Sequence, residues 1–428
     1  MEQGQVVGRV EESSHGRATG RAPSHGRSPV ALERSSRDAV CCTEDLIYLD
    51  NSATSYPKPP EVYEFMDWFF RSHGVNPGRS GYDLSIEAGR MITETRGLLT
   101  AFFGGTDPDR LVFGLNSTDA LNLAIFGLLR PGDHAITSNL DHNSTLRPLW
   151  HLQEQGVEVE HVGFDAHGYI DPDDVIRRLR PSTRAVVLNH GSNVIGTVQP
   201  IAPIGRACRE RGVHLVLDVS QTAGMVPVSM DGLGADVVCF TGHKSLMGPM
   251  GIGGMYVREG VEIRHTRAGG TGVRSTERRH LDEYPFRLEY GTPNLIGVAG
   301  LNAGVKWVIA RGVDAIHEHE VRLWRRLRDG LRAIDAVTLY CQDRDEDRIS
   351  VLAFNVDGVP AGQVGIALDV EHDIAVRTGL HCAPLVHETL GTDAIGGAVR
   401  FSIGPFNSEA DIDAAIEAVR LVRRRSLS

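Results

Sequence analysis

The three lysines of this chain are the residues best placed to do amine chemistry. Only Lys58, Lys244 and Lys306 are lysines among the 44 basic residues. An imine with a carbonyl compound needs a neutral amine, and nearby positive charge favours the neutral form by lowering the pKa. Lys244 follows an apolar run and stands among the small residues of segment 241–245. Lys58 lies in a proline-rich loop and Lys306 in a helical pattern, so Lys244 is the preferred candidate, with a solvated surface lysine as the alternative.

Polar side chains follow several other apolar runs. Ser117 and Thr118 open a helical pattern, where free backbone N–H groups and the helix dipole suit an anion such as phosphate. His142 follows the next run and is suited to stacking on an aromatic ligand or moving protons. Asn193 offers an amide, and Asp218 offers a carboxylate to a protonated ring nitrogen. Taken singly, each has a structural alternative, such as a helix N-cap or an idle loop residue.

A sheet is the element that brings such residues together. From Ile47 to about residue 300, short apolar runs alternate with helical patterns. Strands are expected at 111–113, 135–137, 185–188, 214–217, 237–240 and 253–257, and helices at 120–129, 146–155 and 204–211. Near-continuous apolar strands between helices predict an α/β fold with a mostly parallel sheet covered on both faces. Ligands of such sheets bind beyond the carboxyl ends of the strands, where the polar residues stand.

The chain divides into three predicted parts. Residues 1–45 are Gly-, Ser- and Arg-rich and repeat Ser-His-Gly-Arg, so a disordered tail without a metal site is expected. Residues 46–300 form the large domain. Residues 301–428 form a smaller α+β domain, with helices near 296–311, 313–334 and 409–424 and one more between the strands at 349–354 and 399–402. An exposed loop is expected at 377–397.

Composition excludes some classes of protein. The chain has 428 residues and a net charge of -11, which argues against a nucleic-acid binder. No apolar run approaches the ~20 residues of a membrane helix. Six cysteines form neither a disulfide framework nor paired zinc knuckles. We therefore expect a cytoplasmic protein that binds neither membranes nor nucleic acids.

The order of the polar residues matters more than any one of them. A phosphate-binding loop, a stacking histidine, an amide, a carboxylate and an amine follow one another, each after a strand. A pyridoxal phosphate (PLP) site needs these groups, because the ring must be stacked, its nitrogen paired and its phosphate held. The sequence therefore predicts a PLP enzyme.

Five segments carry a family resemblance: 48–54, 192–196, 241–244, 291–294 and 377–384. In these segments the chain resembles the class V aminotransferase family of fold type I PLP enzymes. It is most similar to the cysteine desulfurase and selenocysteine lyase branch, over residues 46–424. The resemblance implies a large PLP-binding domain, a small C-terminal domain that carries a nucleophile loop, and a homodimer.

The resemblance also implies a role for each matching residue. Lys244 would hold PLP covalently, Asp218 would pair with the ring nitrogen, and His142 would stack on the ring and move protons. The remaining assignments are Gln221 and Asn193 near the ring hydroxyl and substrate, Ser117, Thr118, Thr241 and His243 at the phosphate, Thr292 at the partner subunit's phosphate, and Arg400 and Arg377 at the substrate carboxylate.

Cys382 becomes the implied nucleophile. It would take sulfur from L-cysteine as a persulfide and leave L-alanine, the thiolate being the reactive form. A small buried thiol is the alternative. The short segment after Cys382, with Pro384, resembles the type that works with a small sulfur-acceptor protein. Gly78 and Tyr82 stand where better-known sulfur-mobilising desulfurases carry histidines, which leaves the acceptor open.

Other reactions remain alternatives on the same scaffold. They are selenocysteine lyase, C–S lyase on a cysteine conjugate, aminotransferase and epimerase, because a fold does not fix the reaction. Cys382 favours desulfuration, since a transaminase needs no thiol there. A non-catalytic scaffold is disfavoured, because it would not need Lys244, Asp218, His142 and Arg400 together.

Overall fold

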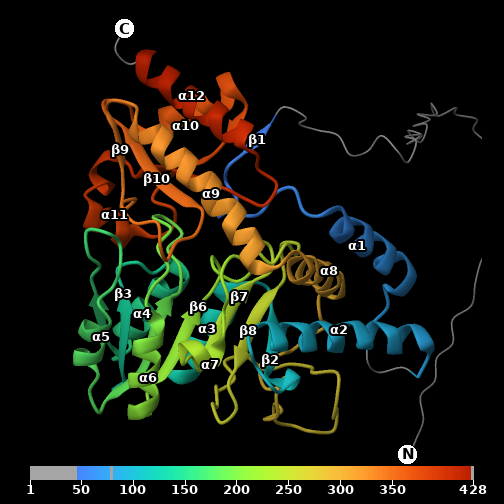
Figure 1. The fold of residues 1–428 in the computed structure, drawn as a ribbon. Helices are drawn as coiled ribbons and strands as arrows, with labels where there is room; N and C mark the ends of the chain where they lie inside the picture. The colour runs from blue at the N-terminus through green and yellow to red at the C-terminus, as the bar shows by residue number, and fades with distance from the viewer. Residues whose placement is uncertain (1–45, 78–80, 426–428) are drawn as a thin grey trace, which may run out of the picture. The chain divides into compact units, whose positions relative to one another are not determined.

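A seven-stranded sheet organises the larger part of the molecule (Figure 1). The computed structural model describes residues 46–77 and 81–425. In spatial order the strands are β2 (Leu111–Gly114), β8 (Gly253–Val257), β7 (Val237–Thr241), β6 (His214–Asp218), β5 (Thr183–Asn189), β3 (His134–Ser138) and β4 (Glu158–Val162). Only the pairs that β8 makes, with β2 and β7, are antiparallel. The predicted α/β fold with a mostly parallel sheet is confirmed.

Both faces of this sheet are buried, which explains its near-continuous apolar strands. In β6, Leu215 and Leu217 pack with α2 (Asp83–Phe102), α6 (Ile201–Arg211) and α8 (Leu295–Arg311). The alternate residue Val216 packs with α3 (Ser117–Leu128) and α4 (Asn143–Glu154) on the other face. Successive strand side chains point to opposite faces, so a strand covered twice needs apolar residues at every position.

A second sheet has four antiparallel strands. In order they are β12 (Arg377–Gly379), β13 (Ala398–Ser402), β10 (Val351–Val356) and β9 (Val337–Leu339). Three helices share its core, and Figure 1 shows them beside the sheet: α9 (Val313–Arg332), α10 (Ala361–His372) and α12 (Glu409–Arg425). The helices and strands expected in this region are confirmed.

The segment after residue 45 joins the two sheets. β1 (Ile47–Tyr48) pairs in parallel with β11 (Ile374–Ala375). Beyond β1, Ser402 of β13 donates its N–H to the Leu49 carbonyl at 2.7 Å. The chain then reaches the loop after β7, where the Ser55 N–H donates to the His243 carbonyl at 3.1 Å. One stretch of about ten residues therefore connects the smaller sheet to the loop that carries Lys244.

Some elements differ from the sequence prediction. The expected exposed loop 377–397 contains β12, α11 (Pro384–Leu390) and the 3-10 helix η2 (Asp393–Ile395), and its Val386 and His387 are buried. That prediction was wrong because two of its apolar and aromatic side chains pack into the core rather than onto a surface. Further elements that the sequence left unassigned are α1 (Pro60–His73), α2, η1 (Pro108–Arg110), β4, α5 (Pro172–Arg178), α7 (Met230–Leu233), β9 and β11.

The predicted tail of residues 1–45 and the departure at Gly78 lie outside the described residues. Tyr82, the other departure, is the exposed residue that precedes α2. Within 46–77 and 81–425, no helix has both the length and the apolar character that crossing a membrane requires.

Candidate active site

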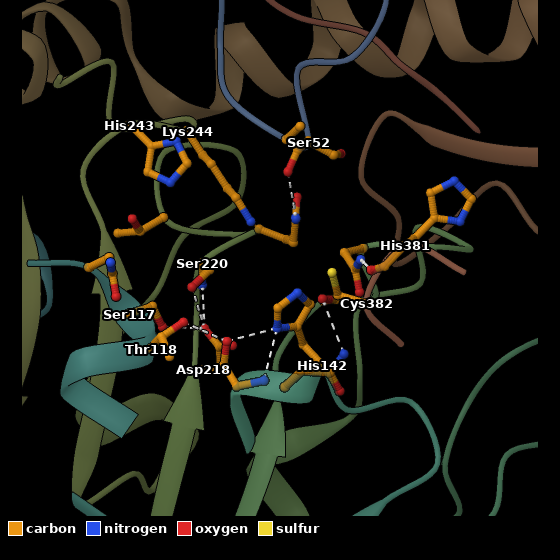
Figure 2. A pocket seen from close by; sticks show the side chains of 18 of the residues that line it. Ser52, Ser117, Thr118, His142, Asp218, Ser220, His243, Lys244, His381 and Cys382 are labelled. Atoms are coloured by element: carbon orange, nitrogen blue, oxygen red, sulfur yellow. Dashed lines mark hydrogen bonds between the residues drawn. The ribbon is translucent and has the colours of Figure 1, made fainter. Parts of the chain in front are cut away.

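A cavity of about 270 Å³ opens at the carboxyl ends of the large-sheet strands (Figure 2). Its lining brings together predicted residues from seven segments of the chain: Ser117, Thr118, His142, Asn193, Asp218, Gln221, Thr241, His243, Lys244, Arg377, Cys382 and Arg400. Figure 2 shows Lys244 and His243 on one side of this cavity and Cys382 and His381 on the other. Among the predicted site residues of the described chain, Thr292 alone does not line it, and it is exposed before α8.

The start of α3 supplies the anion-binding end of the cavity. The Asn116 side chain caps the helix by accepting the Asp119 N–H at 3.0 Å, which leaves Ser117 and Thr118 at the first turn. Gly253 of β8 lies against this turn, and a Cβ there would come within 2.8 Å of the Asn116 Cα. Glycine therefore lets the strand approach the helix start closely enough to shape the loop.

Two polar atoms near this end are buried without a hydrogen-bond partner among the described residues. They are Thr241 Oγ1 and His243 Nδ1. Burial, followed by the charges of Lys244 and Lys58, lowers the pKa of His243 to about 4, so its imidazole is neutral at physiological pH. A buried polar group without a partner costs free energy. These atoms indicate a polar ligand at the start of α3.

Asp218 ends β6 with one oxygen engaged. Its Oδ1 accepts from Ser117 Oγ at 3.1 Å, from Ser220 N at 2.9 Å and from Ser220 Oγ at 2.5 Å. All the hydrogen bonds that described residues donate to this carboxylate reach Oδ1. The side chain is thus fixed in orientation and Oδ2 is left for a cationic group of a ligand.

Lys244 is a half-buried lysine in the loop after β7. Burial is the largest cause that lowers its pKa, to about 8, with Arg400 acting in the same direction and Asp218 opposing it. A lysine with a pKa near 8 has a substantial neutral fraction at physiological pH, whereas one near 10.4 does not. The predicted imine-forming lysine therefore lies in surroundings that favour this chemistry.

His142 precedes α4 and its ring orientation is fixed. Its Nδ1 accepts the Ser144 backbone N–H at 3.1 Å, so the neutral ring carries its proton on Nε2. Burial, followed by the charge of Lys244, lowers the pKa of His142 to about 4. The ring is therefore a neutral, flat surface in the cavity with one N–H to donate.

The donor set fits PLP. Ser117, Thr118, Thr241 and His243 could hold a phosphate, and Asp218 could pair with a protonated ring nitrogen. His142 offers a neutral ring face and Lys244 an amine. The fit rests on two observations. The unpartnered atoms near α3 are suited to a phosphate, and the fixed carboxylate of Asp218 is suited to a protonated ring nitrogen, and PLP carries both groups.

Arg400 is the buried cation of the cavity. Its Nη2 pairs with Asp50 Oδ1 at 2.6 Å and its Nη1 donates to the Asn193 carbonyl at 3.0 Å. Its Nε is buried without a partner among the described residues, as is Oδ1 of Asn193. Gln221, by contrast, is engaged, because its Nε2 donates to the Ser52 carbonyl at 3.1 Å. Arg400 and Asn193 thus keep polar atoms free for a small substrate.

Cys382 is exposed at the cavity and is held by its backbone. His381 and Cys382 both have positive φ, 49° and 56°, and form a tight turn. Asn193 Nδ2 donates to the His381 carbonyl at 2.7 Å, and the Asn143 N–H donates to the Cys382 carbonyl at 2.7 Å. The thiol is therefore accessible on a fixed loop, and the alternative of a small buried thiol is wrong.

His381 does not face the thiol, although it is next to it in sequence. Figure 2 shows its ring directed away from the Cys382 sulfur. Its Nδ1 lies 3.2 Å from Nε2 of the buried His387, whose Nδ1 lies 2.8 Å from Thr392 Oγ1. Burial, followed by Arg400, holds the pKa of His381 well below its usual range. This side chain anchors the loop.

The other two lysines do not line the cavity, but one is closer to it than expected. Lys306 pairs on the surface with Glu94 at 2.5 Å. Lys58 is half-buried, and its Nζ donates to the carbonyl of His243 at 2.5 Å. The surroundings of Lys58 resemble those of Lys244 in one respect that its place in a proline-rich loop did not indicate, because burial lowers its pKa to about 7.

Sequence reasoning assigned no role to several residues of the lining. They are Ser52, Ala53, Asn116, Ser144, Asn189, Gly191, Ser220 and His381. Ser52 and Ala53 lie in segment 48–54, which carried the family resemblance, so a signal was present there. Ser144 and Ser220 act by holding His142 and Asp218, a task that residue type alone does not reveal.

Comparison with known proteins agrees with this geometry. The aminotransferase class-V family matches residues 47–415. A probable cysteine desulfurase of Methanothermobacter thermautotrophicus is 32% identical over 86% of this chain and 92% of its own length. One of Pyrococcus abyssi is 33% identical over 88% and 94%.

Solved structures give the same result. A cysteine desulfurase of Thermococcus onnurineus superposes with a TM-score of 0.83 at 31% identity, over 89% of this chain and 95% of that one. A cysteine desulfurase of Escherichia coli superposes with a TM-score of 0.80 at 28% identity, over 90% and 96%. The chain therefore belongs to the aminotransferase class-V family of PLP-dependent enzymes, in its cysteine desulfurase branch.

Proposed function

We propose that this protein takes sulfur from L-cysteine, holds it as a persulfide on Cys382 and releases L-alanine, with PLP as its cofactor. The observation that carries the proposal is that an exposed thiol and a half-buried lysine of lowered pKa line one cavity. The names of the relatives support the same reaction. Bound PLP supplies an electron sink for the carbon that bears the substrate amine.

The residues around this carbon bind and orient the substrate. Arg400 offers its free Nε to the substrate carboxylate, and the exposed Arg377 lines the cavity at the same end. Asn193 offers the free Oδ1. Fixed donors of this kind hold a small amino acid in one orientation, which places its sulfur toward the side of the cavity where Cys382 stands.

Proton movement falls to Lys244, and His142 supports it. The Lys244 amine has a pKa of about 8 and therefore both takes and returns a proton near neutral pH. His142 has its proton on Nε2 and a pKa of about 4, so it acts as a neutral hydrogen-bond donor and ring support. We assign Lys244 as the proton carrier on these grounds.

The bonds and electrons of the sulfur transfer balance among the substrate and the residues of the site. The Cys382 thiolate attacks the substrate sulfur, a sulfur–sulfur bond forms, and the bond between that sulfur and the substrate β-carbon breaks. The β-carbon keeps the electron pair and takes a proton, which gives L-alanine. No external oxidant is needed, because the two electrons that the sulfur gives up on forming the persulfide stay on the β-carbon, which becomes the methyl group of alanine.

A homodimer and a sulfur acceptor complete the proposal. Large apolar side chains are exposed on α1 and α2, namely Tyr63, Trp68, Phe70, Leu84 and Ile86. Such a patch suits a contact between copies, which would also bring the exposed Thr292 of each chain to its partner's cofactor. A small acceptor protein would take sulfur from exposed Cys382, and a reducing cytoplasm would keep this thiol free.

An assay of sulfide and alanine tests the reaction. The protein with L-cysteine and a reductant should release the two in equal amounts. Cys382→Ala should keep the visible absorption of bound PLP and lose sulfide release, while Lys244→Ala should lose the covalent attachment of the cofactor. Undiminished sulfide from Cys382→Ala would contradict the persulfide and favour a lyase. Consumption of L-cysteine without alanine or sulfide, with the corresponding keto acid or the decarboxylated amine formed instead, would favour a transaminase or a decarboxylating reaction.

A further inference from the structure

The proposed reaction assigns no role to Lys58, although this lysine lies close to the site. It is half-buried, it does not line the cavity, and burial is the cause that lowers its pKa to about 7. Burying an amine is unfavourable unless its hydrogen bonds are made. In a chain with only three lysines, this costly position raises the question of what the amine holds.

The Lys58 amine reaches the backbone next to Lys244. Its Nζ donates to the His243 carbonyl at 2.5 Å and to Ser55 Oγ at 2.6 Å. The Ser55 hydroxyl in turn donates to the Lys244 carbonyl at 2.8 Å. The two carbonyls on either side of the Lys244 Cα are therefore tied to one amine, one directly and one through a hydroxyl.

The His243 carbonyl is saturated with donors. Besides Lys58, it accepts from Thr54 Oγ1 at 3.0 Å and from the Ser55 N–H at 3.1 Å. A carbonyl oxygen has two lone pairs, so three donors leave it no freedom to turn. The Met247 N–H also reaches the Lys244 carbonyl, at 2.9 Å. Both peptide planes that flank Lys244 are consequently fixed.

We propose that Lys58, through Ser55, is a positioning residue that fixes the backbone on both sides of Lys244 and so keeps the Lys244 amine in its buried place. The segment from which Lys58 acts is itself anchored, because Leu49 pairs with Ser402 of the smaller sheet. Lys58 does not touch the cavity and is not a catalytic residue. The claim extends the proposed function, in which Lys244 holds the cofactor.

Competitive acylation of the apoprotein tests this claim without relying on activity. A trace amine reagent is applied between pH 6 and pH 11, and peptide mass spectrometry reports each of the three lysines separately. In the parent, Lys244 should label with a midpoint near 8 and Lys306 should serve as the exposed reference. Lys58→Met should raise the Lys244 midpoint by one pH unit or more, because a loosened backbone admits water to the amine. This shift means about tenfold less neutral amine at neutral pH.

Two variants separate positioning from simple charge and from unfolding. Ser55→Ala keeps the Lys58 side chain but cuts the link to the Lys244 carbonyl, and it should raise the midpoint as well. Lys306→Met is the matched control and should leave the midpoint unchanged. If Lys58→Met does not fold, as judged by thermal unfolding of the apoprotein, Ser55→Ala carries the test. An unchanged midpoint in folded Lys58→Met, or a shift there with none in Ser55→Ala, would overturn the claim.

The holoenzyme gives a second readout that depends on the proposed function. Lys58→Met should lower kcat about tenfold and leave KM for L-cysteine within twofold, because the substrate contacts are untouched. Lowered kcat together with an unchanged Lys244 midpoint would contradict positioning. A shifted midpoint in a protein that releases no sulfide from L-cysteine even as the parent would instead remove the proposed function and leave the Lys58 claim standing.

Discussion

The Lys244 amine and the Cys382 thiol line the same cavity but differ in their exposure to solvent. Lys244 is half-buried, and desolvation of its amine gives it a pKa of about 8, whereas Cys382 is exposed on a turn held by its backbone carbonyls. Removal of water lowers the pKa of an amine and so favours its neutral form, whereas a thiol that reacts with a substrate or a partner must be accessible to it. The same cavity thus provides both conditions.

Borohydride reduction tests the assignment of Lys244 at this scale. The reduced holoprotein should carry the cofactor on the Lys244 peptide, because Lys244 alone of the three lysines lines the cavity. Mass spectrometry of the lysine peptides measures the result. Cofactor trapped on Lys58 or Lys306 would contradict the central assignment, and the Lys306 peptide is the internal control.

Residue type and order were sufficient to predict most of the lining, but not the role of its supports. Strand-end positions identified Asp218, His142 and Lys244, because parallel strands deliver these positions to one edge. Ser55 and Lys58 bind the carbonyl of His243, which is far away in the sequence, and no local sequence pattern predicts such a contact. Thr292 was assigned from the resemblance, and in one chain it lies outside the cavity.

Among the elements of the fold, the turns between strands and helices carry many of the functional side chains. Segment 192–198 presents Asn193, which holds both the Cys382 loop and Arg400. Gly196 lies in this segment with a φ of +77°, and the Ile349 N–H donates to its carbonyl at 2.8 Å. The strands and helices near this turn were predictable from periodicity. The structure of 377–397 was not, because its buried His387 and Val386 give no periodic signal.

Substitution of Gly196 tests the importance of this turn. A Cβ at Gly196 would meet the Val351 carbonyl oxygen at 2.5 Å, so Gly196→Ala combines left-handed strain with a backbone clash. Gly212→Ala is the matched control, since Gly212 has a φ of +67° and open space around it. We expect Gly212→Ala to cost about 1 kcal/mol and Gly196→Ala about 2 kcal/mol more. Equal losses in urea unfolding would contradict the close packing of the turn.

A buried carboxyl beside the smaller sheet makes the stability of the whole molecule depend on pH. Glu320 of α9 is buried, and Ser350 Oγ donates to its Oε2 at 2.7 Å. Burial raises the pKa of Glu320 to about 8 from an ordinary value of 4.5. A carboxyl whose pKa is raised on folding adds stability that is complete below 4.5 and is lost as pH rises through 8.

Glu320→Gln should therefore remove one source of alkaline destabilisation. Between pH 5 and pH 8, the free energy of unfolding of the variant should gain on the parent by at most ~1.4 kcal/mol per pH unit. Urea unfolding at several pH values measures the difference in free energy of unfolding between the variant and the parent. Lys58 and Lys244 contribute a pH dependence of opposite sign, but they do so equally in both proteins, so their contributions cancel in the difference. The control is Glu318→Gln, an exposed position on the same helix. A constant difference between Glu320→Gln and the parent would refute the buried neutral carboxyl.

The proposed function depends most on sulfur passing from the substrate to Cys382. One turnover with L-cysteine, without reductant or acceptor, followed by alkylation and peptide mass spectrometry, measures this directly. We predict one additional sulfur atom on the Cys382 peptide, one equivalent of L-alanine per active site, and no added sulfur on Cys208, Cys239 or Cys341, which are buried. One equivalent of alanine with an unmodified Cys382 peptide, or with the sulfur on another cysteine, would contradict the account.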